Sequence, residues 1–246
     1  MINKIMDIRP GIIPVIGSGG KTSLIMRLAK ELGEAHRVVI CTTTKIMRPD
    51  DIPVILEAPQ APLLESGALS EHFASNGGHG IICVATAVEN APGKLAAPAS
   101  GIARLAAQAD FCLCEADGAK HLPMKAHAPY EPVIPDGSLT AILVAGAEGF
   151  GRPIREATHR PELFAKLAGA SIEDPITPGI LAKVLLAETE SFGHTGPRLL
   201  INRTNASCGD IHEDLEADIV HAKEVKELTG FETYAGAVIP GIIQKL

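Results

Sequence analysis

One run of the chain combines small residues with an ammonium group and hydroxyls, which suits it to binding phosphates. It consists of Gly17, Ser18, Gly19, Gly20, Lys21, Thr22 and Ser23. Glycines allow several backbone N–H groups to surround one anion, and the N-terminus of a following helix adds partial positive charge. We expect Lys21 to contact the β- and γ-phosphates of ATP or GTP, and the Thr22 hydroxyl to contact Mg²⁺. The alternative is a glycine-rich turn whose lysine is only solvated.

The spacing of this run is shorter than that of a standard Walker A loop, G-x-x-x-x-G-K-[ST]. The first glycine of that pattern would fall at Val15, so the chain has only G-x-x-G-K-T. This tighter pattern is similar to the loop of the Mur-type amide ligases. An ATP-dependent ligase is therefore a third hypothesis, although those enzymes need additional domains for which 246 residues leave no room. An apolar run at 12–16 and an amphipathic pattern at 21–33 flank the loop, and they favour nucleotide binding over a structural turn.

Two carboxylates follow the apolar run 110–115. Glu115 ends the run, and Asp117 comes two residues later. An apolar strand that ends in an acid is typical of a Walker B motif, in which a carboxylate holds Mg²⁺ directly or through water. We therefore expect Glu115 to be a metal ligand together with Thr22, and Asp117 to orient a water or act as a general base. The alternative is that one of the two carboxylates caps a turn at Gly118.

Other polar residues also follow apolar runs, where the carboxyl ends of parallel strands would bring them to one edge of a sheet. Thr43 and Lys45 belong to a Thr-Thr-Thr-Lys stretch after one run, and we expect them to contact a phosphate or Mg²⁺. Lys45, Lys120 and Lys125 are expected to hold an acidic second substrate or to stabilise a transferring phosphoryl group. For each cation, a solvated surface position is the alternative.

Asn202 opens the stretch Asn202-Arg203-Thr204-Asn205. This stretch resembles the N-K-x-D element with which GTPases read guanine, but both the lysine and the aspartate are replaced. The missing carboxylate is the group that recognises the guanine amino group, whereas a neutral Asn205 can still hydrogen-bond a base. We expect Asn202 to contribute to nucleotide binding, and the choice between ATP and GTP stays open.

Apolar runs of four to seven residues alternate with helical patterns along the chain. The expected strands cover 12–16, 37–42, 80–86, 110–115, 139–145, 197–202 and 234–239. The expected helices cover 21–33, 99–109, 161–169, 177–190 and 211–229. Many of the strand runs are apolar on both faces, as a parallel sheet covered by helices requires. The pattern predicts one α/β domain over 1–246, with a doubly wound, mostly parallel sheet flanked by helices, similar to P-loop NTPases, and irregular excursions near 49–79 and 118–137.

Composition narrows the classes of partner. The formal net charge of −7 argues against nucleic acid as a partner. Neither a signal peptide nor an apolar run of 18 residues is present, so we expect a cytoplasmic protein without membrane contact. Cys41, Cys83, Cys112 and Cys114 lie in apolar runs and are expected in the core, whereas Cys208 lies in a predicted loop of open role. No cysteine or histidine spacing indicates zinc, and the oligomeric state stays open.

Taken together, these motifs and several further ones resemble the YqeC family. The shared stretches are 15–23, 42–46, 93–95, 115–125, 131–135 and 159–162. The resemblance implies a role in the maturation of selenium-dependent molybdenum hydroxylases, with such an enzyme or its cofactor as a partner. The chain departs from the family pattern at Tyr130, where a histidine is expected, and His127 is a candidate substitute.

Two hypotheses from different classes follow. The first is a Mg²⁺-dependent P-loop enzyme that hydrolyses or transfers the γ-phosphate of ATP or GTP. The second is a nucleotide-gated adaptor with little turnover, in which segments 49–79 and 118–137 act as switches.

Overall fold

The computed structural model describes residues 1–58, 67–193, 195–204 and 211–246. The strands are β1 (Gly11–Gly17), β2 (Arg37–Thr42), β3 (Lys45–Met47), β4 (Val54–Glu57), β5 (Gly80–Ala87), β6 (Lys94–Ala96), β7 (Phe111–Glu115), β8 (Met124–Lys125), β9 (Ile142–Gly146), β10 (Thr158–His159), β11 (Arg198–Asn202), β12 (Glu232–Ala237) and β13 (Ile242–Lys245). The helices are α1 (Ile2–Ile5), α2 (Lys21–Gly33), α3 (Ala68–Ser75), α4 (Ile102–Ala106), α5 (Ile154–Ala157), α6 (Pro161–Ala168), α7 (Pro178–Ala187) and α8 (Ile211–Thr229). Two short 3₁₀ helices cover Ala147–Gly149 and Thr189–Phe192.

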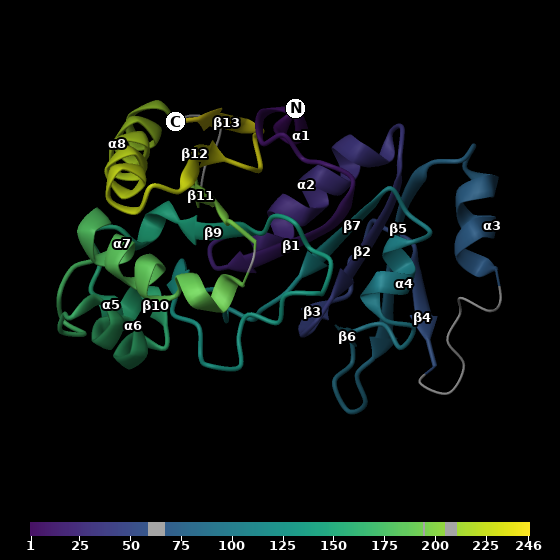
Figure 1. Cartoon of the computed structure of the whole chain (residues 1–246), viewed down its shortest axis with the longest axis horizontal. Helices are drawn as coiled ribbons and strands as arrows, with labels where there is room; N and C mark the ends of the chain where they lie inside the picture. Colours follow the sequence, from purple (N-terminus) through teal and green to yellow (C-terminus); the bar gives the residue numbers. More distant parts are fainter. Residues whose placement is uncertain (59–66, 194, 205–210) are drawn as a thin grey trace.

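One 11-stranded sheet runs through the molecule (Figure 1). Its strand order is β13-β12-β11-β9-β1-β7-β2-β5-β6-β3, and β4 pairs with β5 beside this path. The strands from β12 to β5 all pair in parallel, whereas β13, β6 and β3 pair antiparallel at the two ends. The predicted α/β class with a mostly parallel sheet flanked by helices is therefore confirmed.

The chain reverses its direction of travel across the sheet at β1. After β1 it proceeds through β2 and β5 and returns to β7 on one side of β1, and then it continues through β9, β11 and β12 on the other side. In open α/β sheets, ligands bind at such a reversal, outside the carboxyl ends of the strands. The loop that follows β1 occupies this position.

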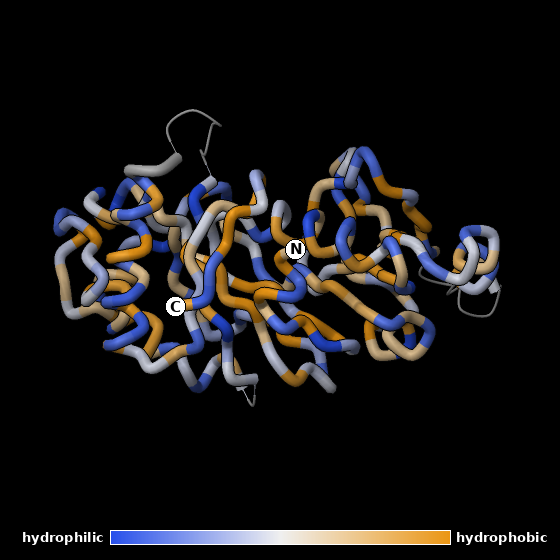
Figure 2. The backbone as a smooth tube through the Cα atoms, turned by 90° about the horizontal axis from the view of Figure 1, so that it is seen from above, coloured by the Kyte–Doolittle hydropathy of each residue, from blue (hydrophilic) through white to orange (hydrophobic). Residues whose placement is uncertain are grey.

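Helices cover both faces of the sheet. Because side chains alternate along a strand, Val15 packs in the core beneath α1 and α2, whereas its neighbour Ile16 packs in the core beneath α5 to α8. A third core, which includes Val39 and Phe73, joins α3 and α4 to the same face as α5 to α8. In Figure 2 the hydrophobic segments gather along the central strands. This two-sided burial explains why the strand runs are apolar throughout.

Two parts of the predicted outline were wrong. Segment 49–79 was predicted to be irregular, but it contains β4, which extends the sheet, and α3, which covers it; residues 59–66 lie outside the described part. The helix predicted over 99–109 is only Ile102–Ala106, since Gly101, with φ of +81°, immediately precedes it. Segment 118–137 contains no regular element except the two-residue strand β8. None of the helices in the described ranges has the length and apolar character needed to cross a membrane.

Candidate functional site: a glycine loop, an acidic strand end and a polar cleft

The glycine loop (residues 17–20) connects β1 to α2 at the carboxyl edge of the sheet. Gly19 has φ of +78°, and a Cβ there would lie 2.4 Å from the Cα atom of Gly146. Gly17 has φ of +91°, and a Cβ there would lie 2.2 Å from the carbonyl oxygen of Val144. Only glycine, which has no Cβ atom, fits both this positive-φ backbone conformation and the close approach of β9. The glycines thus seat the loop directly against the neighbouring strand.

The N-terminal end of α2 presents unsatisfied backbone donors. Within the described part of the chain, the backbone N–H groups of residues 19–23 donate no hydrogen bond, and the first helical bond runs from the N–H of Leu24 to the carbonyl of Gly20. Four such donors are left at the start of any α-helix, and they carry the positive end of its dipole. Residues 18–23 also line the cleft described below. The loop therefore offers an anion several N–H groups at once.

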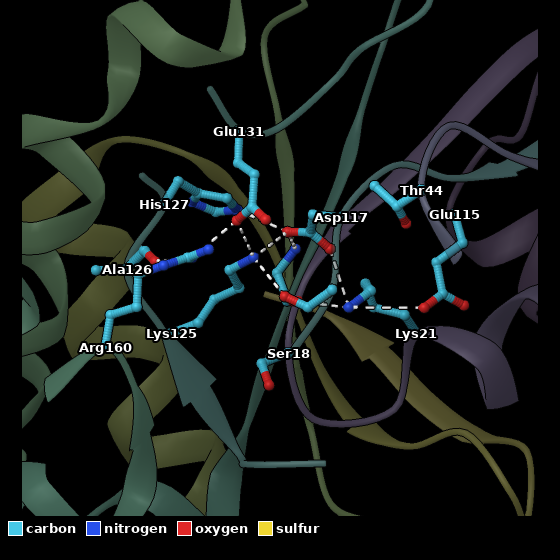
Figure 3. Close-up of polar contacts among 12 residues, drawn as sticks. Ser18, Lys21, Thr44, Glu115, Asp117, Lys125, Ala126, His127, Glu131 and Arg160 are labelled. Atoms are coloured by element: carbon cyan, nitrogen blue, oxygen red, sulfur yellow. Dashed lines mark hydrogen bonds and ion pairs between the residues drawn. The ribbon is translucent and has the colours of Figure 1, made fainter. Parts of the chain in front are cut away.

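Lys21 is held in place over the loop. Its Nζ atom donates to the carbonyl oxygen of Gly17 at 2.7 Å, and it lies 2.9 Å from Oδ1 of Asp117 and 3.8 Å from Oε1 of Glu115 (Figure 3). Only 4% of its side chain is exposed. The ammonium group is therefore held in a fixed orientation at the floor of the cleft and is not free in solvent.

Thr22 and Glu115 meet at the edge of the cleft, as the sequence predicted for a pair of metal ligands. The Thr22 hydroxyl donates to Oε2 of Glu115 at 2.9 Å, and both residues line the cleft. Burial raises the pKa of Glu115, and this effect outweighs the opposing effects of Lys21 and Thr22. A group that lowers the cost of this charge, such as a cation, would therefore be favoured here.

Asp117 does not fit the predicted role of general base. It is fully buried and does not line the cleft. Its Oδ2 atom accepts the backbone N–H of Gly17 at 2.8 Å and also contacts Lys125 at 3.0 Å and His127 at 2.8 Å. Burial alone would raise the pKa of Asp117, but the surrounding cations and hydrogen bonds hold it well below the usual range. A carboxylate with this low basicity and no access to the cleft cannot activate a water there.

His127 bridges two buried carboxylates. Its Nε2 atom faces Oδ2 of Asp117 at 2.8 Å, and its Nδ1 atom faces Oε2 of Glu188 at 2.7 Å. Burial lowers the pKa of His127, but the two carboxylates raise it by more, so it lies above its ordinary value. The protonated ring, which has two donors, can satisfy both acceptors. His127 is thus the structural partner of Asp117, and it lies in the interior rather than in the cleft.

Lys125 extends this buried group of charges toward the surface. Its Nζ atom donates to the carbonyl of Gly118 at 2.7 Å and to Glu131 at 2.9 Å, in addition to its bond to Asp117. Arg160 then donates to the same oxygen of Glu131 at 2.8 Å. We call these side chains the buried ion-pair network: Asp117, Lys125, His127, Glu131, Arg160 and Glu188. Lys125 therefore serves as a buried counter-ion, not as the substrate-binding cation that we predicted.

The side chain of Tyr130, at the position where the family pattern predicts a histidine, lies at the surface. Tyr130 is 72% exposed, and its ring lies 5.8 Å from the guanidinium carbon of Arg160. His127 does not take its place in space, because His127 is oriented inward by Glu188 and Asp117.

A cleft of about 830 Å³ opens above the glycine loop. Of the predicted site residues, Ser18, Gly19, Gly20, Lys21, Thr22, Ser23, Lys45, Glu115 and Lys120 line it. Gly17, Thr43, Asp117, Lys125 and Asn202 do not line it. The structure therefore brings most of the predicted residues together at one cleft and places the others behind it.

Asn202 supports the glycine loop from behind. Its side-chain amide donates to the carbonyl of Gly19 at 2.8 Å, and its oxygen accepts the backbone N–H of Val238 at 3.0 Å. Thr43 contacts the end of β7 through its backbone, because its N–H donates to the carbonyl of Glu115 at 3.1 Å. Asn205 and Cys208 lie outside the described residues.

Several residues of the site were not found from the sequence. Glu188 follows an apolar helix directly and carries no motif, so nothing along the chain signals its contact with His127. Lys94, His121 and Glu148 also line the cleft, although none of them was a candidate site residue. Lys94 and His121 lie in the shared family stretches 93–95 and 115–125, which were the available signals.

Comparison with known proteins places these features within one family. A family model described as YqeC protein matches residues 13–162, which include the glycine loop, Glu115, Asp117 and His127. The chain is 31% identical over 165 residues to the "Uncharacterized protein YqeC" of Escherichia coli (strain K12). That match covers 65% of this chain and 62% of the relative, so it spans less than two thirds of the relative's length. No solved structure is significantly similar to the chain.

Proposed function

This chain belongs to the YqeC family, and we propose that it binds a nucleoside triphosphate with Mg²⁺ in the cleft above the glycine loop. The observation that carries the proposal is the meeting of three groups at one place. The Lys21 ammonium, the Thr22 hydroxyl and the Glu115 carboxylate all face the cleft beside the unsatisfied N–H groups of the loop. A phosphate loop combines the same kinds of group, although the glycine spacing here is shorter than in a standard Walker A loop.

The chain's own groups would do most of the work in binding phosphates. The loop N–H groups would bind an anion without prior reorganisation, because the backbone of the glycine loop packs closely against β9. Lys21 is already immobilised by Gly17 and Asp117, so little side-chain entropy remains to be lost when a phosphate arrives. Together these groups would neutralise part of the phosphate charge.

The Thr22–Glu115 pair fits a magnesium ion. A hydroxyl and a carboxylate are hard oxygen donors, and Mg²⁺ in nucleotide sites takes one or two protein ligands and fills its shell with phosphates and water. No group of three or more metal-binding His, Cys, Asp or Glu side chains occurs among the described residues, which suits an ion held mainly by its nucleotide. When bound, the ion would supply charge neutralisation to the phosphates.

Two candidate functions differ in what happens to the γ-phosphate of the bound nucleotide. One is hydrolysis or transfer to a second substrate, as in other P-loop enzymes. The other is a nucleotide-gated adaptor with slow turnover, and one observation favours it: Asp117, the carboxylate expected to activate water, is buried away from the cleft. The resemblance to the YqeC family suggests that a molybdenum hydroxylase or its cofactor is the client in either case.

The first experiment is a calorimetric titration of ATP, GTP and their non-hydrolysable analogues, each with Mg²⁺. The proteins are wild type, Lys21→Ala and Lys30→Ala, the last being a matched control because Lys30 is exposed on the same helix and outside the cleft. We expect Lys21→Ala to weaken binding by about 100-fold or more, since it removes a charged contact from a buried position. Circular dichroism melting checks that both variants fold.

Each outcome decides the proposal. Binding that is lost in Lys21→Ala and kept in Lys30→Ala supports it, and the preferred base emerges from the same titrations. Equal binding by Lys21→Ala and wild type, or no binding by wild type, overturns it. Phosphate release measured on the same samples then separates an enzyme from an adaptor.

A further inference from the structure

The cleft extends beyond the glycine loop to a second wall. This wall is the antiparallel pair of strands β3 and β6, which come at the far end of the strand order from β1. In the antiparallel register Met47 lies opposite Lys94, and Lys45 lies two residues before Met47. Residues at these positions share one face of a sheet, and all three line the cleft. The β3–β6 strand pair therefore presents two ammonium groups and an apolar side chain to the cleft.

The charge that lines the cleft is opposite in sign to that of the whole protein. The chain has a formal net charge of −7, yet five Lys and Arg side chains line the cleft against three carboxylates. Two of those carboxylates are already paired, Glu115 with Lys21 and Glu131 with Lys125 and Arg160. By contrast, Lys45, Lys94 and Lys120 form no ion pair with any residue that the structure describes. The cleft thus carries uncompensated positive charge.

A histidine of β10 also borders the cleft. His159 lines the cleft, and its Nδ1 atom is buried without a hydrogen-bond partner in the described ranges. Burial and the nearby positive charges of Arg160, Lys125 and Lys120 lower the pKa of His159. Positive charges gathered around a cleft in this way attract anions.

We propose that the part of the cleft between the β3–β6 strand pair and the loop 118–123 binds a second ligand, a small molecule with two or more phosphate or carboxylate groups. This inference rests on the proposed function only in assuming that the second ligand meets a bound nucleotide. The cations that would bind the second ligand belong to elements other than the glycine loop. Lys45 and Lys94 hold the anionic groups, and the exposed Met47 between them contacts the body of the ligand. Focused positive charge in a cleft raises the local concentration of such an anion and its rate of arrival.

The test measures anion binding with the glycine loop disabled. Inorganic phosphate and citrate are titrated separately, by calorimetry at low ionic strength, into Lys21→Ala protein, so that binding at the loop is suppressed. The same titrations are repeated after adding Lys45→Gln with Lys94→Gln, and after adding Lys30→Gln with Lys183→Gln. The second pair makes the same change in charge at exposed positions outside the cleft.

We expect Lys21→Ala protein to keep its anion binding. The Lys45→Gln and Lys94→Gln pair should weaken that binding by about tenfold, and the control pair should leave it unchanged. Stronger binding of phosphate than of citrate assigns a phosphate ester, and the reverse order assigns a polycarboxylate. Absence of anion binding in Lys21→Ala, or equal losses from both pairs, overturns the proposal. Because nucleotide binding is measured separately on wild type, failure there would overturn the proposed function and leave the anion result standing.

Discussion

The Nε2 atom of His127 lies 2.8 Å from Oδ2 of Asp117, and both side chains are buried. The same Oδ2 atom accepts the backbone N–H of Gly17, where β1 passes into the glycine loop. One carboxylate oxygen therefore joins an interior imidazole to the backbone of the candidate phosphate site. The link continues through Glu188 to the end of α7, so the loop is anchored to the helical layer as well as to the sheet.

Stability should depend on pH through His127. Its pKa is raised in the folded protein, so its contribution is fully present below the unfolded value of about 6.5 and is lost as the pH rises through the higher folded value. Replacing it in His127→Gln should lower the free energy of unfolding by roughly 2–4 kcal/mol at pH 6. Urea unfolding of both proteins from pH 6 to pH 9 should show this difference shrinking as the pH rises. A difference that stays constant would contradict the assignment of a charged imidazolium.

Replacing the two acidic residues at the end of β7 with amides should change stability in opposite directions: Glu115 is the last residue of the strand, and Asp117 follows it by two. Burial raises the pKa of Glu115, so its charge costs stability, and Glu115→Gln should leave the free energy of unfolding unchanged or slightly higher while Mg²⁺-dependent nucleotide binding is lost. Asp117→Asn is the matched contrast. This substitution removes the buried negative charge that pairs with Lys125 and Lys21, and it should lower the free energy of unfolding by about 3–5 kcal/mol. Denaturant unfolding at pH 7 checks both, and a large loss in Glu115→Gln would refute the distinction.

Close packing of the glycine loop should make Gly19 intolerant of a side chain. In Gly19→Ala a Cβ atom would meet the backbone of Gly146 at 2.4 Å, so either the loop or β9 must move. The control is Gly78→Ala, whose φ of +89° is equally unfavourable but which has no atom within 4 Å of the added Cβ. We expect the free energy of unfolding to fall by about 1 kcal/mol in the control and by at least about twice that in Gly19→Ala. Gly19→Ala should also lose nucleotide binding. Similar losses in the two variants would show that backbone strain alone is responsible.

The cysteines of the sheet should be inert in the folded protein. Cys41 and Cys112 are buried with their sulfur atoms 3.6 Å apart, and hydrogen bonding to Cys112 and Cys114 together with burial raises the pKa of Cys41. Burial raises the pKa of Cys83 to about 12. Since the thiolate is the reactive form, alkylation by iodoacetamide at pH 8 should be more than about 100-fold slower than in urea. Peptide mapping by mass spectrometry measures each site, and rapid labelling of Cys41 or Cys83 without denaturant would argue against a closed core.

Much of the secondary structure could be predicted because its signals are local. The bounds of α2 and β2 agree with the prediction, since a glycine loop, an amphipathic repeat and a two-sided apolar run each mark their own limits. Helix α3 and strand β4 were missed because neither is periodic enough to stand out among prolines and glycines. Their stability comes from contacts with β5 and the core around Val39, which no local window contains.

The sequence by itself determined the α/β class, the glycine loop and the pairing of Thr22 with Glu115. Each depends on spacing along one segment or on the rule that parallel strands end at a common edge. Only the tertiary structure decided that Asp117 and Lys125 are interior and that Glu188 completes their network. It alone also showed Lys94 to face the cleft. Burial and pairing depend on residues brought together from distant parts of the chain, so the type of a residue sets what it can do, and its surroundings select which of those roles it performs.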